Sequence, residues 1–211
     1  MVGVVTISAS YGAAGAYVGP AVAEHLGLEF FDRVIPLEVA RRLAIDDDVA
    51  VAADEHPPRL VDRLLAALAN VAVPIGPDPG REMLGSRTSY CTSTEDVLRR
   101  IADGPGGVVL GRAAMVVLGG RPDVLCVRLD GPADARAAQA AALNGVDVET
   151  ARAEQRQADR VREAYAHVFY GVSQSDRTLY HVSIDSTALP VQACVDMIVV
   201  AARARFAGLH G

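Results

Sequence analysis

The chain has 211 residues, of which 51% are hydrophobic and 22% charged, and its formal net charge is −6. This length and composition suit a single α/β domain with one sizeable core. The negative charge argues against general nucleic-acid binding, which needs a basic surface. Charged residues interrupt the apolar runs before the roughly 20 residues that a membrane helix needs, so no membrane partner is expected. The opening residues lack the pattern of a signal peptide, and we expect a cytoplasmic protein.

The first predicted element is a buried strand from Val4, followed by a turn of small residues and a helix. This order is typical of a phosphate-binding loop, in which glycines let backbone N–H groups face an anion at the positive end of the helix dipole. The usual signature, GxxxxGK[ST], also places a lysine on the transferring phosphate and a hydroxyl group on magnesium. The candidate anion-binding residues are Ser10, Gly12, Ala13, Ala14, Gly15, Ala16 and Tyr17.

This loop departs from the signature at several positions. Ser10 takes the place of the first glycine, Ala16 that of the lysine and Tyr17 that of the hydroxyl residue. No change of register restores the lysine, because the chain contains none. Pro20 predicts that the helix begins at about Tyr17 or Val18, since a start at Gly15 would place a proline inside it. The sequence therefore predicts an anion-binding loop without its main cation.

Polar residues follow the next predicted strand, which ends in Asp32 and Arg33 and precedes a helix that contains Arg41. Groups just beyond the carboxyl ends of parallel strands face the ligand crevice, so Asp32 and Arg33 are candidate ligand-binding residues. An equally good interpretation is that Asp32 caps the following helix.

Residues 46–90 are predicted to form an inserted, mostly helical region. Its leucine-rich segment at 60–70 favours core or subunit contacts, and a homodimer through this segment is an open alternative. The proline- and glycine-rich residues 73–87 predict a loop. No metal site is predicted, because three consecutive carboxylates at residues 46–48 suit a solvated face better than a metal geometry.

A further buried strand at 108–112 ends in Gly111 and Arg112. The Arg112 guanidinium would lie at the mouth of the same crevice, where it suits bidentate contact with a phosphate group. The alternative is an ion pair that holds the crossover connection.

The second half of the chain predicts strands at 124–130 and 179–184, with helices after each. Asp147 is predicted to cap a long polar helix that runs to Tyr170. Arg152, Arg156 and Arg160 would share one face of this helix and repel one another unless an anion or carboxylates intervene. Acidic residues are available on the same helix, so a surface helix with salt bridges is the alternative to an anion site.

Five motifs, in the order in which they occur along the chain, resemble the cytidylate kinase-like family of P-loop nucleoside monophosphate kinases. The resemblance covers almost the whole chain. The motifs are TISASYGAAG, FFDRVI, VVLGRAA, the segment Asp159-x-x-Arg162-x-x-Tyr165 with Gly171, and IDSTALPVQACVDMI. In that family an arginine commonly replaces the loop lysine. Here Ala16 lacks even that charge.

The resemblance implies a P-loop NTPase-type three-layer α/β/α fold with a parallel central sheet, formed by one domain over residues 1–211. It implies that a monophosphate binds against Arg112 and the insert at 46–90, and that residues 145–172 form a lid. It also implies that ATP binds at residues 10–17 and that Mg²⁺ is a cofactor. The implied substrate-binding residues are Asp32, Arg33, Arg41, Gly111 and Arg112. The implied catalytic residues are Arg112, Arg156, Asp159, Arg160 and Arg162, which would neutralise charge on the transferring phosphoryl group.

Two functional hypotheses remain open from the sequence. The first is a kinase that uses ATP to phosphorylate CMP, dCMP or a related nucleoside monophosphate. The second is an inactive pseudo-kinase that binds nucleotides or proteins, because the loss of a loop cation costs roughly two to three orders of magnitude in rate. A shikimate- or coenzyme A-precursor-type kinase is disfavoured by the terminal IDST segment.

Overall fold

A computed structural model describes residues 3–32, 95–111 and 113–208. Apart from residues 95 and 96, these belong to one compact unit, Met1–Val34 with Val97–Gly211. The predicted insert at 46–90 lies outside the described residues.

The centre of this unit is a parallel sheet of five strands in the order β2-β3-β1-β4-β5. The strands are β1 (Val4–Ala9), β2 (Phe30–Asp32), β3 (Gly107–Leu110), β4 (Val124–Asp130) and β5 (Val182–Asp185). Among the described residues the helices are α1 (Gly15–Leu26), α6 (Ala114–Leu118), α7 (Ala133–Asn144), α8 (Val148–Tyr170) and α9 (Val191–Ala207), together with residues 95–103 and the 3₁₀ turn Arg177–Leu179.

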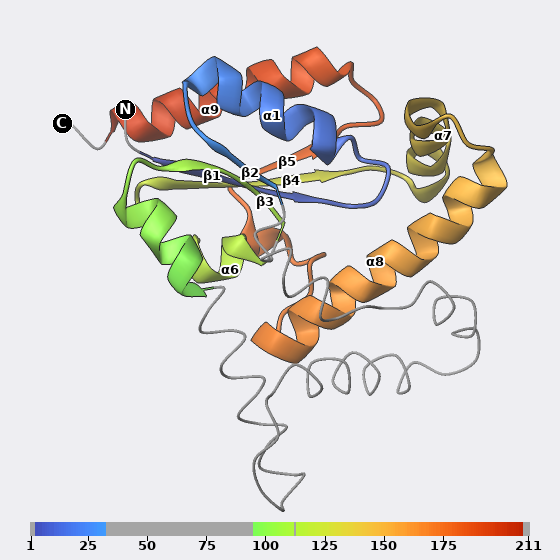
Figure 1. The fold of residues 1–211 in the computed structure, drawn as a ribbon, viewed down its shortest axis with the longest axis horizontal. Helices are drawn as coiled ribbons and strands as arrows, with labels where there is room; N and C mark the ends of the chain where they lie inside the picture. The colour runs from blue at the N-terminus through green and yellow to red at the C-terminus, as the bar shows by residue number, and fades with distance from the viewer. Residues whose placement is uncertain (1–2, 33–94, 112, 209–211) are drawn as a thin grey trace, which may run out of the picture. The chain divides into compact units, whose positions relative to one another are not determined.

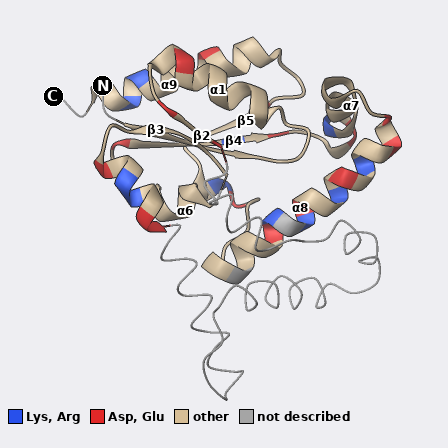
Figure 2. Cartoon of the chain, viewed as in Figure 1, with Lys and Arg blue, Asp and Glu red and all other residues tan. Residues whose placement is uncertain are grey.

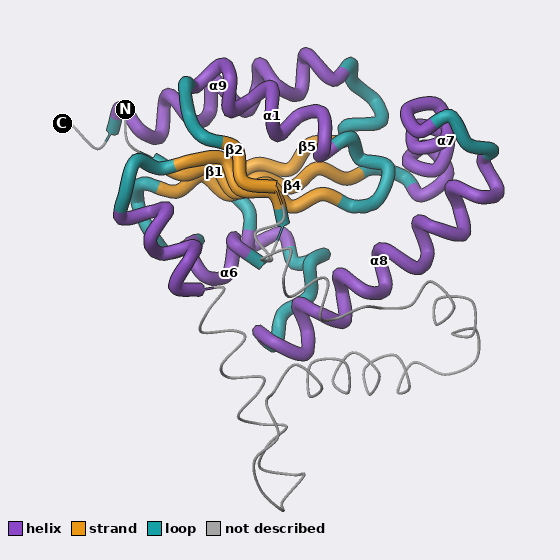
Figure 3. The backbone as a smooth tube through the Cα atoms, in the orientation of Figure 1, coloured by secondary structure: helices purple, strands orange, loops and turns teal. Residues whose placement is uncertain are grey.

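Helices cover both faces of the sheet, as Figures 1 and 3 show. On one face, Val5 and Ile7 of β1 belong to a core that includes buried residues of α1 and α9. On the other face, Val4 belongs to a second core with α6 and residues 95–103. This double burial explains why the strands read as continuous apolar runs rather than as an alternating pattern. The predicted three-layer α/β/α fold with a parallel sheet is confirmed.

The predicted cap at Asp147 is confirmed, and α1 ends at a glycine. Gly27 follows α1 in the left-handed conformation (φ 65°), and its amide caps the helix. The Asp147 side chain accepts a hydrogen bond from Thr150 N at the start of α8.

The predicted start of α1 is wrong. The helix begins at Gly15, so Pro20 lies inside it. Pro20 removes only the bond to the Ala16 carbonyl, and both residues are exposed, so water can take the place of the missing donor. The last strand is also shorter than predicted, because Arg177–Leu179 forms a 3₁₀ turn before it.

Candidate functional site

The turn between β1 and α1 is a tightly packed loop at the carboxyl end of the sheet. Gly12 has φ 78°, and a Cβ atom there would lie 2.1 Å from the backbone oxygen of Arg136. A Cβ atom on Gly15 would lie 2.6 Å from the Cβ atom of Ala9. Close packing of the loop against its neighbours therefore requires glycine at both positions. The left-handed conformation of Gly12 is a second reason for glycine there.

Four backbone amides of the loop have no hydrogen-bond partner among the described residues. They belong to Gly12, Ala14, Gly15 and Ala16. The last three amides lie at the N-terminus of α1, where the helix dipole adds partial positive charge. A group of amides in this position is suited to bind an anion such as a phosphate group.

Three consecutive carbonyl groups of the loop are held by side chains from other elements. Arg136 Nη1 donates to Tyr11 O (2.7 Å), Gln139 Nε2 to Gly12 O (2.9 Å) and Ser186 Oγ to Ala13 O (3.0 Å). The carbonyl and the following N–H group of a trans peptide point in opposite directions. The Ser186 contact therefore turns the amide of Ala14 away from Ser186, and the Arg136 contact does the same for the amide of Gly12.

Tyr11 links the loop to α7 and α8, which lie past the loop end of the sheet (Figure 1). Its amide donates to Asp159 Oδ1 (2.8 Å). Its phenol donates to Glu154 and accepts from Asn144 Nδ2 (3.3 Å). Asp159 in turn pairs with Arg162 at 3.4 Å. The structure thus brings two of the predicted lid residues, Asp159 and Arg162, to the loop.

The other two predicted lid arginines do not reach the loop. Arg156 and Arg160 are exposed on α8 and make no hydrogen bond or ion pair with any described residue. Arg152 pairs instead with Asp134 (3.0 Å) and Glu149 (3.2 Å), which agrees with the alternative of a surface helix with salt bridges. Figure 2 shows the two signs of charge alternating along α8.

The remaining predicted residues fall partly outside the described chain. Asp32 ends β2 and is exposed. Gly111 follows β3 with φ 81°, and its amide donates to Ile7 O at 2.8 Å, which places it beside the end of β1. Arg33, Arg41 and Arg112 lie outside the described residues.

Tyr17 does not block the loop. The residue is 47% exposed, and its phenol donates to Leu143 O of α7 (3.3 Å). In the described ranges no group of three or more His, Cys, Asp or Glu side chains could hold a metal ion. None of the described helices is long and apolar enough to cross a membrane.

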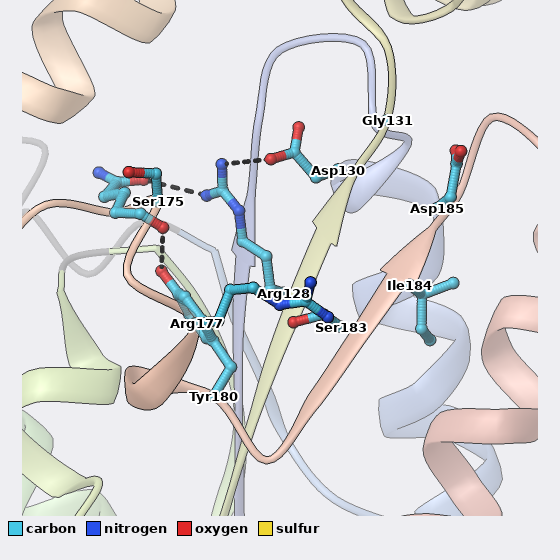
Figure 4. Close-up of a pocket in the computed structure, with 10 residues that line it drawn as sticks. Arg128, Asp130, Gly131, Ser175, Arg177, Tyr180, Ser183, Ile184 and Asp185 are labelled. Carbon is cyan, nitrogen blue, oxygen red and sulfur yellow. Dashed lines mark hydrogen bonds and ion pairs between the residues drawn. The ribbon is translucent and has the colours of Figure 1, made fainter.

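Sequence reasoning missed Arg128, Arg136 and Ser186, all of which contact the loop. One signal was available: Arg128 and Asp130 are the two charged residues of an otherwise apolar strand. They also line a pocket of about 350 Å³ at the ends of β4 and β5, together with Arg177 and Ser183 (Figure 4). Arg136 and Ser186 carried no such signal, because their contacts join segments far apart in the chain.

The central sheet is parallel and has five strands, and a glycine-containing loop joins its first strand to its first helix. Amides of this loop have no hydrogen-bond partner among the described residues. These features define a P-loop protein with the three-layer α/β/α fold. The profile of the cytidylate kinase-like family matches residues 4–188. The chain therefore belongs to the cytidylate kinase-like family, as its motifs predicted.

One of the similar solved structures agrees on the fold, and two more are reported for comparison. The structure is similar to an uncharacterized protein from Eubacterium ventriosum ATCC 27560, with a TM-score of 0.62 at 18% identity over 96% of this chain and 99% of that one. A gluconokinase from Sinorhizobium meliloti 1021 gives 0.47 at 16% identity over 98% and 93% of the two chains. A shikimate kinase from Acinetobacter baumannii in complex with shikimate gives 0.46 at 16% identity over 95% of each chain. A search of curated protein sequences found no match.

Proposed function

We propose that this protein binds a nucleoside triphosphate at residues 10–17 and transfers its terminal phosphoryl group to CMP, dCMP or a related nucleoside monophosphate. One observation carries the proposal: in a chain of the cytidylate kinase-like family, the amides of Ala14, Gly15 and Ala16 at the start of α1 have no hydrogen-bond partner within the described part of the chain.

The chemistry of phosphoryl transfer suits such a loop. The reaction depends on positioning and on neutralising charge in the transition state rather than on covalent steps by the protein. The amides of Ala14 to Ala16 would bind phosphate oxygens of ATP, and the contacts to the loop carbonyls would hold those amides in place before ATP arrives. Arg162 of α8 and Arg112 after β3 would add positive charge near the transferred group.

The residues fit ATP better than they fit magnesium. The loop has no serine or threonine at position 17, and the Tyr17 phenol is bound to Leu143 O instead. Mg²⁺ commonly binds through one or two carboxylates, phosphate oxygens and water. Position 17 therefore offers Mg²⁺ no ligand in this structure.

A second candidate function is nucleotide binding without transfer. The observation that favours it is the neutral Ala16 side chain at the position where the family carries a cation. The first candidate needs another source of positive charge, whereas the second does not.

Two measurements separate the candidates. Calorimetric titration with ATP and with CMP measures binding, and a coupled ADP-release assay with each ribo- and deoxyribonucleoside monophosphate measures transfer. We expect ATP binding and turnover with CMP or dCMP, with turnover abolished in Arg112→Ala and retained in Arg203→Ala, a substitution on α9. Binding without turnover would favour the second candidate. Absence of both binding and turnover would contradict both.

A further inference from the structure

Ala14 holds a conformation that is unusual for a residue with a side chain. Its φ is 56° and its ψ 21°, which lie in the left-handed region. For a residue other than glycine this region is sterically unfavourable, and such strain persists only where the surroundings hold it. Ala113, with φ 51° at the start of α6, is the other non-glycine residue of the described chain with a positive φ. The conformation of Ala14 therefore requires a restraint on each of the two peptide groups beside it.

The first turn of α1 restrains the peptide group that follows Ala14. The Ala14 carbonyl accepts hydrogen bonds from Tyr17 N and Val18 N, both at 3.0 Å. These are the bonds that begin the helix, so this peptide group cannot rotate unless the first turn unwinds. The helix does not restrain the peptide group between Ala13 and Ala14, which carries the amide proposed to bind phosphate.

Ser186 restrains that second peptide group. Its buried hydroxyl donates to Ala13 O at 3.0 Å, and no other group of the described residues donates to this carbonyl. The alternative acceptor, Asp130 O, is farther away at 3.3 Å and already accepts from the Ser186 amide at 3.0 Å. Ser186 directly follows Asp185, which pairs with Asp130 at the neighbouring ends of β5 and β4 (Figure 4). The sheet therefore fixes the position of the donor that holds the loop.

Rotation of the peptide group between Ala13 and Ala14 would reverse the direction of the Ala14 amide. It would also bring the φ of Ala14 to a negative value and so relieve the strain. The Ala13 carbonyl would then point where the amide points now, and its oxygen would repel a phosphate group. The strain of Ala14 thus favours the rotated state, whereas the hydrogen bond from Ser186 favours the observed one.

We propose that Ser186 is a positioning residue for nucleotide binding, because its hydroxyl keeps Ala14 in the strained conformation that presents the Ala14 amide to a phosphate group. The proposal rests on the nucleotide binding proposed above and adds the pair of residues that keeps the loop ready before the ligand arrives. It gives a role to the IDST segment. In a purely structural role, Ser186 would only tie the turn after β5 to its neighbours, and the strain of Ala14 would have no part in binding.

The two roles differ in how substitutions at Ser186 and Ala14 combine. Ser186→Ala removes the donor and should weaken ADP binding about tenfold, the size of one lost hydrogen bond. Ala14→Gly removes the strain, because glycine adopts the left-handed conformation freely. Alone it should change the ADP affinity less than twofold, but combined with Ser186→Ala it should restore most of the lost affinity. A purely structural role predicts no such restoration, because the effects of the two substitutions would simply add.

The test measures ADP affinity by calorimetry, at a temperature at which circular dichroism shows each variant to be folded. Ala113→Gly is the matched control, since it relieves the same strain away from the loop and should leave Ser186→Ala tenfold weaker. Thr187→Ala removes a hydroxyl that donates to Asp185 Oδ1 at 2.6 Å within the same turn, and should change the affinity less than twofold. If Ser186→Ala does not fold, Ser186→Cys takes its place, because a thiol of similar shape is a weaker donor.

Three results would overturn the inference and keep the proposed function, provided that the unaltered protein binds ADP. The first is equally tight binding by Ser186→Ala or by the cysteine variant used in its place. The second is that Ala14→Gly restores none of the lost affinity, and the third is that Ala113→Gly restores as much. If the unaltered protein does not bind ADP, the proposed function itself is wrong and the inference fails with it.

Discussion

Substitution of Gly12 by alanine tests whether the loop depends on its close approach to α7. The residue has φ 78°, and the new methyl group would lie 2.1 Å from the backbone oxygen of Arg136. The left-handed conformation costs a residue with a side chain about 1 kcal/mol. The overlap adds about 2 kcal/mol, because a backbone carbonyl inside a helix cannot move aside as a flexible side chain can. We expect a loss of about 3 kcal/mol, which for a chain of this size lowers Tm by about 9 °C.

Gly27→Ala is the matched control. Gly27 has nearly the same conformation, φ 65°, but a Cβ atom there would have no other atom within 4 Å. Only the conformational cost of about 1 kcal/mol applies, and Tm should fall by about 3 °C. The two variants are compared by thermal unfolding, followed by circular dichroism. Urea unfolding checks that m, the dependence of the unfolding free energy on urea concentration, is unchanged. An equal loss of stability in Gly12→Ala and Gly27→Ala would refute the reasoning, because the overlap with Arg136 would then contribute nothing.

Three further predictions concern single contacts. Ser186→Ala leaves a buried loop carbonyl without its donor and should cost about 1–3 kcal/mol in urea unfolding; an unchanged midpoint would contradict the role given to this contact. Asp147→Ala should lower Tm at pH 7, because it removes the cap to Thr150 N. Hydrogen bonds from the Thr150 hydroxyl and, second, from the Thr150 amide hold the pKa of Asp147 below its ordinary value of 3.8. The difference from the unaltered protein should therefore shrink as the pH falls below 3.8, and an equal difference at pH 7 and pH 3 would argue against a charged cap.

The third of these predictions concerns His181, whose Nδ1 accepts a hydrogen bond from Cys126 N at 2.8 Å. Burial, together with the charge of Arg205, lowers the pKa of His181 from 6.5. Just below pH 6.5 the unfolded chain binds a proton that the folded chain does not, so stability is complete above that pH and falls as the pH decreases. His181→Asn should flatten this dependence in urea unfolding between pH 7.5 and 5. An identical slope would contradict the assignment.

Local sequence patterns were sufficient for most of the fold. The buried strands at 4–9 and 124–130, the Gly27 and Asp147 helix ends and the loop position follow from apolar runs, glycine conformation and capping chemistry, which act over a few residues. The start of α1 shows the limit of such rules. Pro20 predicts a later start, yet packing of Gly15 against Ala9 and the solvent exposure of Pro20 allow a helix that includes the proline.

The sequence by itself also determined what the loop lacks, since a chain without lysine cannot place one at position 16. Only the tertiary structure decided what surrounds the loop. Arg128, Arg136 and Asp159 lie 118, 125 and 148 residues from the loop residues that they contact. No local pattern links positions so far apart. They meet because β4 pairs with β1 and because α7 and α8 turn back over the end of the sheet, so long-range packing selects the charges that reach the loop.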